Sequence, residues 1–256
     1  MKVIVSGGGT GGHIYPAIAM CQKLEEEIEN LEILYVGLND GPEKRIVKKY
    51  GYKFKAIDAM GLPRRISKRL FKSLFTNFKG FNEAKKIIKE FKPDLVIGTG
   101  GYVCAPILYQ ASKKHIKTLI HESNSFPGVT TRFLSNKVDL VCISFEEAKK
   151  HLKNQNNVYV TGNPVRTSFN TSYSQKDLEN LGIKKDRPVV FSFGGSNGSK
   201  FLNEAVSQMS ELLDGKFYLL HQTGPKNYDD FIKNTKENKY IKAFSYIDNI
   251  DLFYAV

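Results

Sequence analysis

The chain has 256 residues, 41% of them hydrophobic, which is enough for one large domain or two smaller ones. Its net charge of +12 favours an anionic partner such as nucleic acid, an acidic membrane surface or a phosphorylated substrate, with scattered surface lysines as the alternative. Three widely spaced cysteines argue against a disulfide framework, and no apolar run reaches the about 18 residues of a membrane span, so we expect a cytoplasmic protein, free or lying on a membrane.

The first twenty residues read as a buried strand, a glycine-rich turn and a helix, with no signal peptide before them. Five of the six residues from Gly7 to Gly12 are glycine. A glycine turn at a helix N-terminus offers free N–H groups to a phosphate, and a strand–helix turn that binds nothing is the alternative. No Gly-Lys-Ser/Thr follows, which excludes a P-loop. The match to a dinucleotide-binding turn is weak, since the second strand ends at Asn39 and not at an acid.

Strand-like and helix-like segments alternate along the rest of the first half, which predicts a parallel sheet covered by helices. A second glycine turn, 98–101, follows the strand 94–97, and a helical pattern then runs to about Lys114. In a doubly wound sheet both glycine turns open on the carboxyl edge, where such folds bind ligands. Further strands are expected at 33–37, 54–57, 118–121, 139–143 and 158–160, and helices at 43–50, 81–91 and 128–135.

Residues 62–81 combine apolar residues at spacings of three and four with Arg and Lys, and contain no acid. A basic amphipathic helix rich in Phe is typical of the interface of an anionic bilayer. The alternatives are a helix that packs its Phe face on the sheet, and nucleic-acid binding, for which no recognised motif is present. The candidate membrane patch consists of Arg65, Arg69, Leu70, Phe71, Leu74, Phe75 and Phe78.

Polar residues follow the strand 118–121, at a sheet edge where ligands bind. Glu122 and Asn124 are therefore candidates for a site. A loop or helix cap is the alternative for Glu122, and a satisfied core histidine is the alternative for His121.

A domain boundary is expected after residue 162, where Gly and Pro interrupt the pattern and a polar stretch follows. The pattern then restarts with a strand at 189–193, a third glycine turn at 194–199 and a helix at 200–213. Further strands at 217–221 and 243–244 bring the second half to about three strands, which is too few for a doubly wound domain. We therefore expect the second domain to be incomplete.

Five motifs occur in an order that resembles the MurG family of bacterial N-acetylglucosaminyltransferases. They are Gly8–His13 (GGTGGH), Gly100–Val103 (GGYV), His121–Asn124 (HESN), Gly162–Arg166 (GNPVR) and Gly194–Gly198 (GGSNG). The resemblance covers residue 1 to about residue 250. It implies the GT-B architecture of two Rossmann-like, doubly wound parallel-sheet domains. Residues 1–162 would be the acceptor- and membrane-binding domain, and residues 163–256 an incomplete nucleotide-sugar donor domain.

The resemblance also implies a reaction, an inverting transfer of N-acetylglucosamine from UDP-N-acetylglucosamine (UDP-GlcNAc) to the C4 hydroxyl of lipid I. Lipid I is undecaprenyl-pyrophosphoryl-MurNAc-pentapeptide, and the product, lipid II, serves peptidoglycan synthesis. The family works on the cytoplasmic face of the bacterial membrane. No Asp-x-Asp pair is present, so we expect that no metal is required, and we expect no cofactor and no nucleic-acid partner.

By resemblance, individual residues receive roles. His13 stands where the family has its proposed base, with Glu122 as second candidate; capping or phosphate contact without proton transfer is the alternative for His13. The residues that match donor contacts are Thr10, Gly11, Gly12, Asn124, Arg166, Ser196 and Ile247. Those expected at the acceptor diphosphate are Gly11, Gly12, Gly100, Gly101 and Tyr102. Arg166 and the Ser196 turn would stabilise charge on the UDP leaving group.

Two departures from the family pattern matter. Ser123 replaces a glutamine, and the family segment that grips the donor comes after the position of Val256, so we expect this chain to bind UDP-GlcNAc poorly. Two other readings stay open: another GT-B lipid glycosyltransferase with a diacylglycerol acceptor, against which the motifs at 8–13 and 121–124 argue, and a non-catalytic dinucleotide- or membrane-binding fragment.

Overall fold

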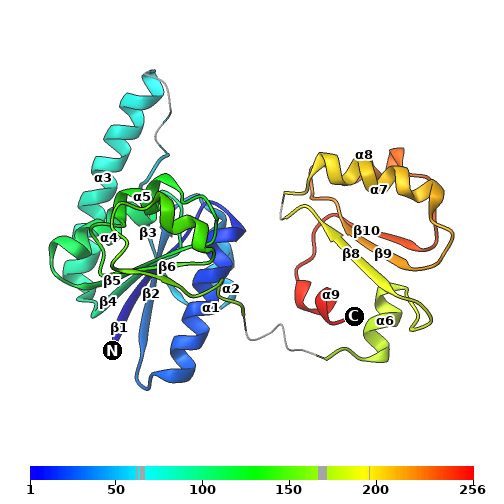
Figure 1. The fold of residues 1–256 in the computed structure, drawn as a ribbon, viewed down its shortest axis with the longest axis horizontal. Coiled ribbons are helices and arrows are strands. Elements are labelled where there is room, and N and C mark those ends of the chain that lie inside the picture. The colour runs from blue at the N-terminus through cyan, green and yellow to red at the C-terminus, as the bar shows by residue number, and fades with distance from the viewer. Residues whose placement is uncertain (62, 64–66, 167–171, 196) are drawn as a thin grey trace. The chain divides into compact units, whose positions relative to one another are not determined.

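The computed structural model describes residues 1–61, 63, 67–166, 172–195 and 197–256. The chain forms two compact units, residues 1–167 and 168–256 (Figure 1). Sequence analysis placed the boundary after residue 162. Each unit is an α/β structure with a parallel sheet of its own.

The first unit contains a seven-stranded parallel sheet in the order β3-β2-β1-β4-β5-β6-β7. The strand order reverses between β1 and β4, where Ser6 pairs with Gly98. This reversal confirms the doubly wound fold and brings the two glycine turns together at the topological switch point. The strands are β1 (Lys2–Ser6), β2 (Glu32–Leu38), β3 (Lys53–Ile57), β4 (Leu95–Gly98), β5 (Lys117–Glu122), β6 (Leu140–Ile143) and β7 (Val158–Val160).

Helices cover both faces of this sheet because the central strands are apolar on both sides. Val3 and Val5 of β1 join the core cluster that includes Ile18 of α1, whereas Ile4 joins the opposite cluster with Ile107 of α4. This alternation follows from the two-residue period of a strand. The helices are α1 (Gly11–Glu27), α2 (Pro42–Lys49), α3 (Lys68–Phe91), α4 (Cys104–Lys113), α5 (Val129–Leu134) and the short 3-10 helix η1 (Glu146–His151).

The basic amphipathic segment forms one helix, α3, which continues to Phe91 and extends beyond the rest of the first unit (Figure 1). Of the stretch 62–81 that carries the basic amphipathic pattern, the helix includes the residues from Lys68 onward, and Pro63 is not helical. Ser67 is the N-cap residue, with extended backbone angles. Residue 62 itself and Arg65 of the candidate membrane patch lie outside the described residues.

The second unit has a parallel sheet with the three strands expected from its pattern, in the order β10-β9-β8. Sequence analysis missed two short helices, α6 and α8. Ser174 and Asp177 form a capping box at the start of α6, a signal that was readable in the sequence. The elements are α6 (Gln175–Leu181), β8 (Val189–Phe193), α7 (Lys200–Leu212), β9 (Tyr218–Gln222), α8 (Tyr228–Asn234), β10 (Ile241–Phe244) and α9 (Ile250–Ala255).

Candidate active site

The two glycine turns of the first unit pack backbone against backbone. A Cβ on Gly101 would collide with the carbonyl oxygen of Gly8, and Gly101 has a φ of +81°. A Cβ on Gly7 would collide with Thr99 Oγ1. Part of the glycine richness therefore serves close packing between the turns, and only part of it leaves room for a ligand.

The ligand side of the first turn is formed by its last residues. Gly9, Thr10 and Gly12 are exposed, and a Cβ on Gly9 would meet nothing within 4 Å. The helix α1 begins at Gly11, and the side chain of its N-cap Thr10 makes no capping hydrogen bond. The backbone N–H groups of Gly11 and Gly12 make no hydrogen bond to any described residue. These groups, at the positive end of α1, suit a phosphate.

His13 is oriented by the second turn. Its Nδ1 lies 3.1 Å from the carbonyl oxygen of Thr99, and Thr99 Oγ1 donates to the backbone carbonyl of His13 at 2.6 Å. A carbonyl oxygen only accepts, so in the neutral imidazole Nδ1 carries the proton and Nε2 holds the lone pair. The ring fits because Gly100, which is buried and has a φ of +108°, has no side chain there. The half-buried imidazole is therefore held in the tautomer that a base needs.

Glu122 is buried and saturated with hydrogen bonds. One carboxylate oxygen accepts from the backbone N and the side-chain Nδ2 of Asn124, at 3.0 and 2.7 Å. The other accepts from Gly128 N at 2.9 Å and from Thr131 Oγ1 at 2.7 Å. These four donors occupy the lone-pair sites of the carboxylate, which favours a role in holding the loop before α5 over proton transfer. Asn124, a predicted donor contact, is part of this loop.

The motif at 121–124 contacts the motif at 162–166. His121 Nε2 donates to the carbonyl oxygen of Gly162 at 3.0 Å, and Ser123 Oγ donates to Asn163 Oδ1 at 3.1 Å. The ring of His121 is buried, and its Nδ1 has no hydrogen-bond partner among the described residues. It is thus a core histidine with one nitrogen satisfied, which ties the end of β5 to the segment leaving the first unit.

Arg166 lies against helix α1 and against Tyr50, the residue that follows α2. Its Nη1 donates to the hydroxyl of Tyr50 at 2.7 Å, and its guanidinium lies 4.8 Å from the ring centroid of Tyr15.

Tyr102, expected at the acceptor diphosphate, is 39% exposed and close to Gly61.

In the second unit, Gln222 links the third glycine turn to Ile247. Its Nε2 donates to the carbonyl oxygen of Gly195 at 2.9 Å, and its Oε1 accepts from Ile247 N at 2.8 Å. Ile247 is buried. Ser196, the other candidate donor contact here, lies outside the described residues. Gln222 was missed because the strand was expected to end one residue earlier, at His221.

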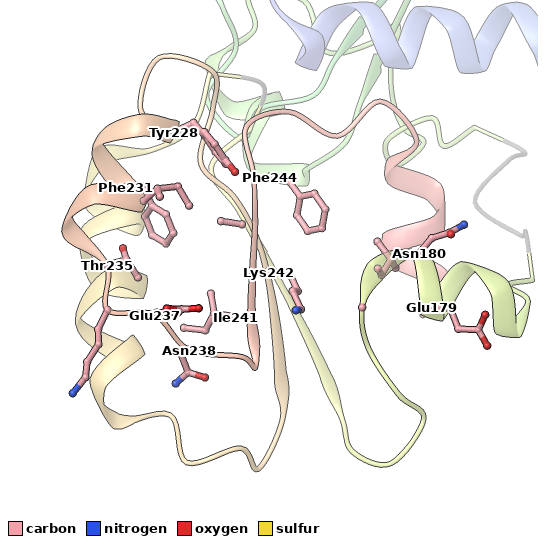
Figure 2. A pocket seen from close by; sticks show the side chains of 15 residues that line it. Glu179, Asn180, Tyr228, Phe231, Thr235, Glu237, Asn238, Ile241, Lys242 and Phe244 are labelled. Carbon is pink, nitrogen blue, oxygen red and sulfur yellow. The ribbon is translucent and has the colours of Figure 1, made fainter.

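A cavity of about 760 Å³ lies elsewhere in the second unit, between α6, α8 and β10 (Figure 2). Tyr228 and Phe231 of α8 and Thr235, which follows it, line one side of it, and Asn180 lies on the other. None of the candidate site residues that the structure describes lines this cavity. In the parts of the chain that the structure describes, no group of three metal-binding side chains is found.

The candidate membrane patch is exposed on α3. Phe71, Phe75 and Phe78 are 69%, 74% and 68% exposed, and Leu74 is 51% exposed, whereas Ala84 and Ile88 further along the helix are buried. The Phe face of the first half therefore does not pack on the sheet. Lys68, Arg69 and Lys72 are exposed beside it. No helix among the described residues is long and apolar enough to span a membrane.

We expect stability to fall in mild acid because of two buried histidines. Burial lowers the pKa of His121 and of His221, which contacts Ser192 and Asn203. Below the unfolded-state pKa of about 6.5 the unfolded chain binds more protons, so each histidine removes stability as pH falls, at up to about 1.4 kcal/mol per pH unit. Urea unfolding between pH 7.5 and 5.5 measures the slope.

The control for this prediction is the exposed His115. His121→Gln, whose amide can still donate to Gly162, should flatten the pH dependence, whereas His115→Gln should leave it unchanged. Equal slopes in the wild type and His121→Gln would show that His121 is not a source of the acid sensitivity.

Two family models and several relatives match this chain. The N-terminal domain of glycosyltransferase family 28 matches residues 3–143, and its C-terminal domain matches residues 189–256. A relative from Finegoldia magna is 50% identical over 261 residues, which cover 100% of this chain and 70% of the relative. Its name is UDP-N-acetylglucosamine–N-acetylmuramyl-(pentapeptide) pyrophosphoryl-undecaprenol N-acetylglucosamine transferase. The chain belongs to the MurG family, within glycosyltransferase family 28.

Further relatives agree with the MurG assignment. A transferase of the same name from Ruminiclostridium cellulolyticum is 41% identical and is covered to 71% of its length. The crystal structure of Acinetobacter baumannii MurG has a TM-score of 0.67 and 24% identity, with 99% of this chain and 70% of that one covered. A UDP-GlcNAc 2-epimerase from Neisseria meningitidis, solved with UDP-GlcNAc bound, has a TM-score of 0.62 and 14% identity, with 99% and 75% covered. These two structures support the GT-B-like fold alone, since transferase and epimerase share it.

Proposed function

We propose that this chain belongs to an inverting glycosyltransferase that moves N-acetylglucosamine from UDP-GlcNAc to the C4 hydroxyl of lipid I, forming lipid II. The relatives named for this transfer support the substrates. The observation that carries the chemistry is His13, with Nδ1 held by Thr99 and Nε2 left as acceptor beside the N-terminus of α1. A sugar hydroxyl is a poor nucleophile until a base accepts its proton.

In the proposed reaction, Nε2 of His13 accepts the proton of the C4 hydroxyl while that oxygen bonds to the anomeric carbon of the donor sugar. The bond from this carbon to the UDP oxygen breaks, and its electron pair leaves with UDP. Attack from the opposite face inverts the anomeric centre. The free N–H groups of Gly11 and Gly12 would bind the acceptor diphosphate, with Gly100, Gly101 and Tyr102 forming the neighbouring turn. The donor contacts proposed above rest on the motif resemblance.

The proposed location is the cytoplasmic face of the bacterial membrane, as a peripheral protein. The exposed Phe and Leu side chains of α3, with adjacent Lys and Arg, suit an anionic bilayer in which a polyprenyl-linked acceptor is embedded. The proposed acceptor site and α3 belong to the same unit, so membrane binding would bring the acceptor-binding unit to its substrate.

The test of the function is calorimetry of this chain with a short-chain, water-soluble lipid I analogue and with UDP-GlcNAc. Binding of the analogue with weak donor binding is the expected result. Binding of a diacylglycerol acceptor in place of the analogue would favour another lipid glycosyltransferase. A folded chain that binds neither acceptor nor donor would contradict the proposal.

Membrane binding has its own test. The variant with Phe71, Phe75 and Phe78 all changed to Ser should partition onto phosphatidylglycerol vesicles at least about tenfold more weakly, because each exposed ring that enters the interface contributes apolar area. Its thermal stability should be unchanged. Phe201→Ser, at an 81% exposed Phe outside this patch, is the matched control. Equal vesicle binding by the triple variant and the wild type would exclude α3 as the membrane face.

A further inference from the structure

Glu43, in the first turn of α2, is fully buried although it carries a carboxyl group. Carboxylates are rarely buried to this extent unless their oxygens are hydrogen-bonded. The oxygens of Glu43 accept from two backbone N–H groups in different segments. Leu38 N, at the end of β2, donates at 2.8 Å, and Gly9 N, in the first glycine turn, donates at 3.2 Å.

Three glycines make room for this one side chain. A Cβ on Gly37 would lie 2.6 Å from Cγ of Glu43, and a Cβ on Gly8 or Gly41 would collide with the carboxyl group. Contacts this close do not occur between a real Cβ and its neighbours, so each glycine is required while Glu43 keeps this place. Three separate segments are thus adapted to a single carboxylate.

The same turn is held from both sides. Gly8 lies between the Glu43 carboxylate and Gly101 of the second turn. The buried Tyr35 hydroxyl donates to the carbonyl oxygen of Gly7 at 2.7 Å, and burial raises the pKa of Tyr35, so it remains a neutral donor. Glu43 draws the N–H of Gly9 inward, which leaves the N–H groups of Gly11 and Gly12 as those that face a ligand.

We propose that Glu43 is a positioning residue, which fixes the turn 7–12 in the conformation that binds the acceptor diphosphate. It acts through the backbone of Gly9 and does not touch the ligand, because its side chain is 0% exposed. The identity of the ligand rests on the proposed function. A dinucleotide-binding fold has an acidic residue at the end of its second strand, which binds a ribose. In this chain the acidic residue, Glu43, comes from the helix that follows that strand, and it binds the backbone of the glycine turn.

The test variant is Glu43→Gln, which keeps the shape of the side chain but has only one acceptor oxygen, so one of the two N–H groups faces an amide NH₂. The dissociation constant of the water-soluble lipid I analogue should rise about tenfold or more at a temperature where the variant is folded. The matched control is Asp139→Asn. Asp139 also accepts from a backbone N–H and a hydroxyl, both of Thr118 and both at 2.8 Å, at the opposite edge of the same sheet. Asp139→Asn should change the dissociation constant of the lipid I analogue less than twofold.

A second measurement uses no ligand. In ¹H–¹⁵N spectra of the free protein, Glu43→Gln should shift the amide resonances from Gly9 to His13, and Asp139→Asn should not. Shifts confined to Leu38 and Gly9, or wild-type binding by Glu43→Gln, would overturn the positioning role. If the wild type fails to bind the analogue, the proposed function fails, while the spectra still decide the role of Glu43.

Discussion

Replacing His13 by Ala or Asn should lower the kcat of N-acetylglucosamine transfer about 10²- to 10⁴-fold, the usual contribution of a general base. The two variants differ in structure, because the amide nitrogen of Asn can take the place of Nδ1 and donate to Thr99, whereas Ala cannot. Asn therefore keeps the anchor without supplying a base. Steady-state turnover with UDP-GlcNAc and the lipid I analogue measures the loss.

Binding separates this base from a residue that only caps the helix or touches phosphate. Calorimetry with the analogue should give His13→Asn a dissociation constant close to that of the wild type. The same assay on Glu122→Gln provides the comparison, since Glu122 holds the loop before α5 through four hydrogen bonds. Wild-type turnover by His13→Asn would refute the base assignment.

The sequence was sufficient to predict the sheet and the position of the turns. The apolar run Val3–Val5 and the glycines after it predict a strand that ends in a ligand-facing turn, and the strand at 94–97 repeats the pattern. The doubly wound order then places both turns side by side. His13 was identified from the motif, but its tautomer depends on Thr99, 86 residues away, which no local pattern indicates.

Residues missed from the sequence act through the backbone of other segments. A dinucleotide-binding pattern directs attention to the strand end near Asn39, whereas the acid that contacts the turn, Glu43, comes from the first turn of the following helix. The contact between His121 and Gly162 joins two motifs 41 residues apart, and it arises from the order β5-β6-β7 in the sheet. Such pairs follow from topology and cannot be read from spacing.

The helix α3 could likewise be predicted from the sequence only in part. The spacing of Phe71, Phe75 and Phe78 predicts a helix, but the spacing does not say which face is buried. The middle of α3 is fixed by tertiary contacts. Asn77 Oδ1 accepts from Met60 N and Asn77 Nδ2 donates to Met60 O, both at 2.9 Å. Gly80 lies against the carbonyl oxygen of Asp58. Anchoring at these positions leaves the Phe face in solvent.

Gly101→Ala should destabilise the first unit by about 2–5 kcal/mol. An alanine at a φ of +81° costs about 1–2 kcal/mol in backbone strain. Displacement of the Gly8 carbonyl adds about 1–3 kcal/mol of overpacking. The Glu43 carboxyl group contacts Gly8 on the other side. The first turn therefore cannot move away from the added methyl group without displacing Glu43. Urea unfolding measures the loss of stability.

The matched control is Gly51→Ala, because Gly51 has a φ of +84° and a Cβ there would meet nothing within 4 Å. It should cost only the backbone strain, about 1–2 kcal/mol, and leave binding of the acceptor analogue intact. The difference between the two variants isolates the packing of one glycine turn against the other. If both variants lose the same stability and both bind the analogue, the contact between the turns does not support the site, and the glycines of the second turn serve local backbone geometry alone.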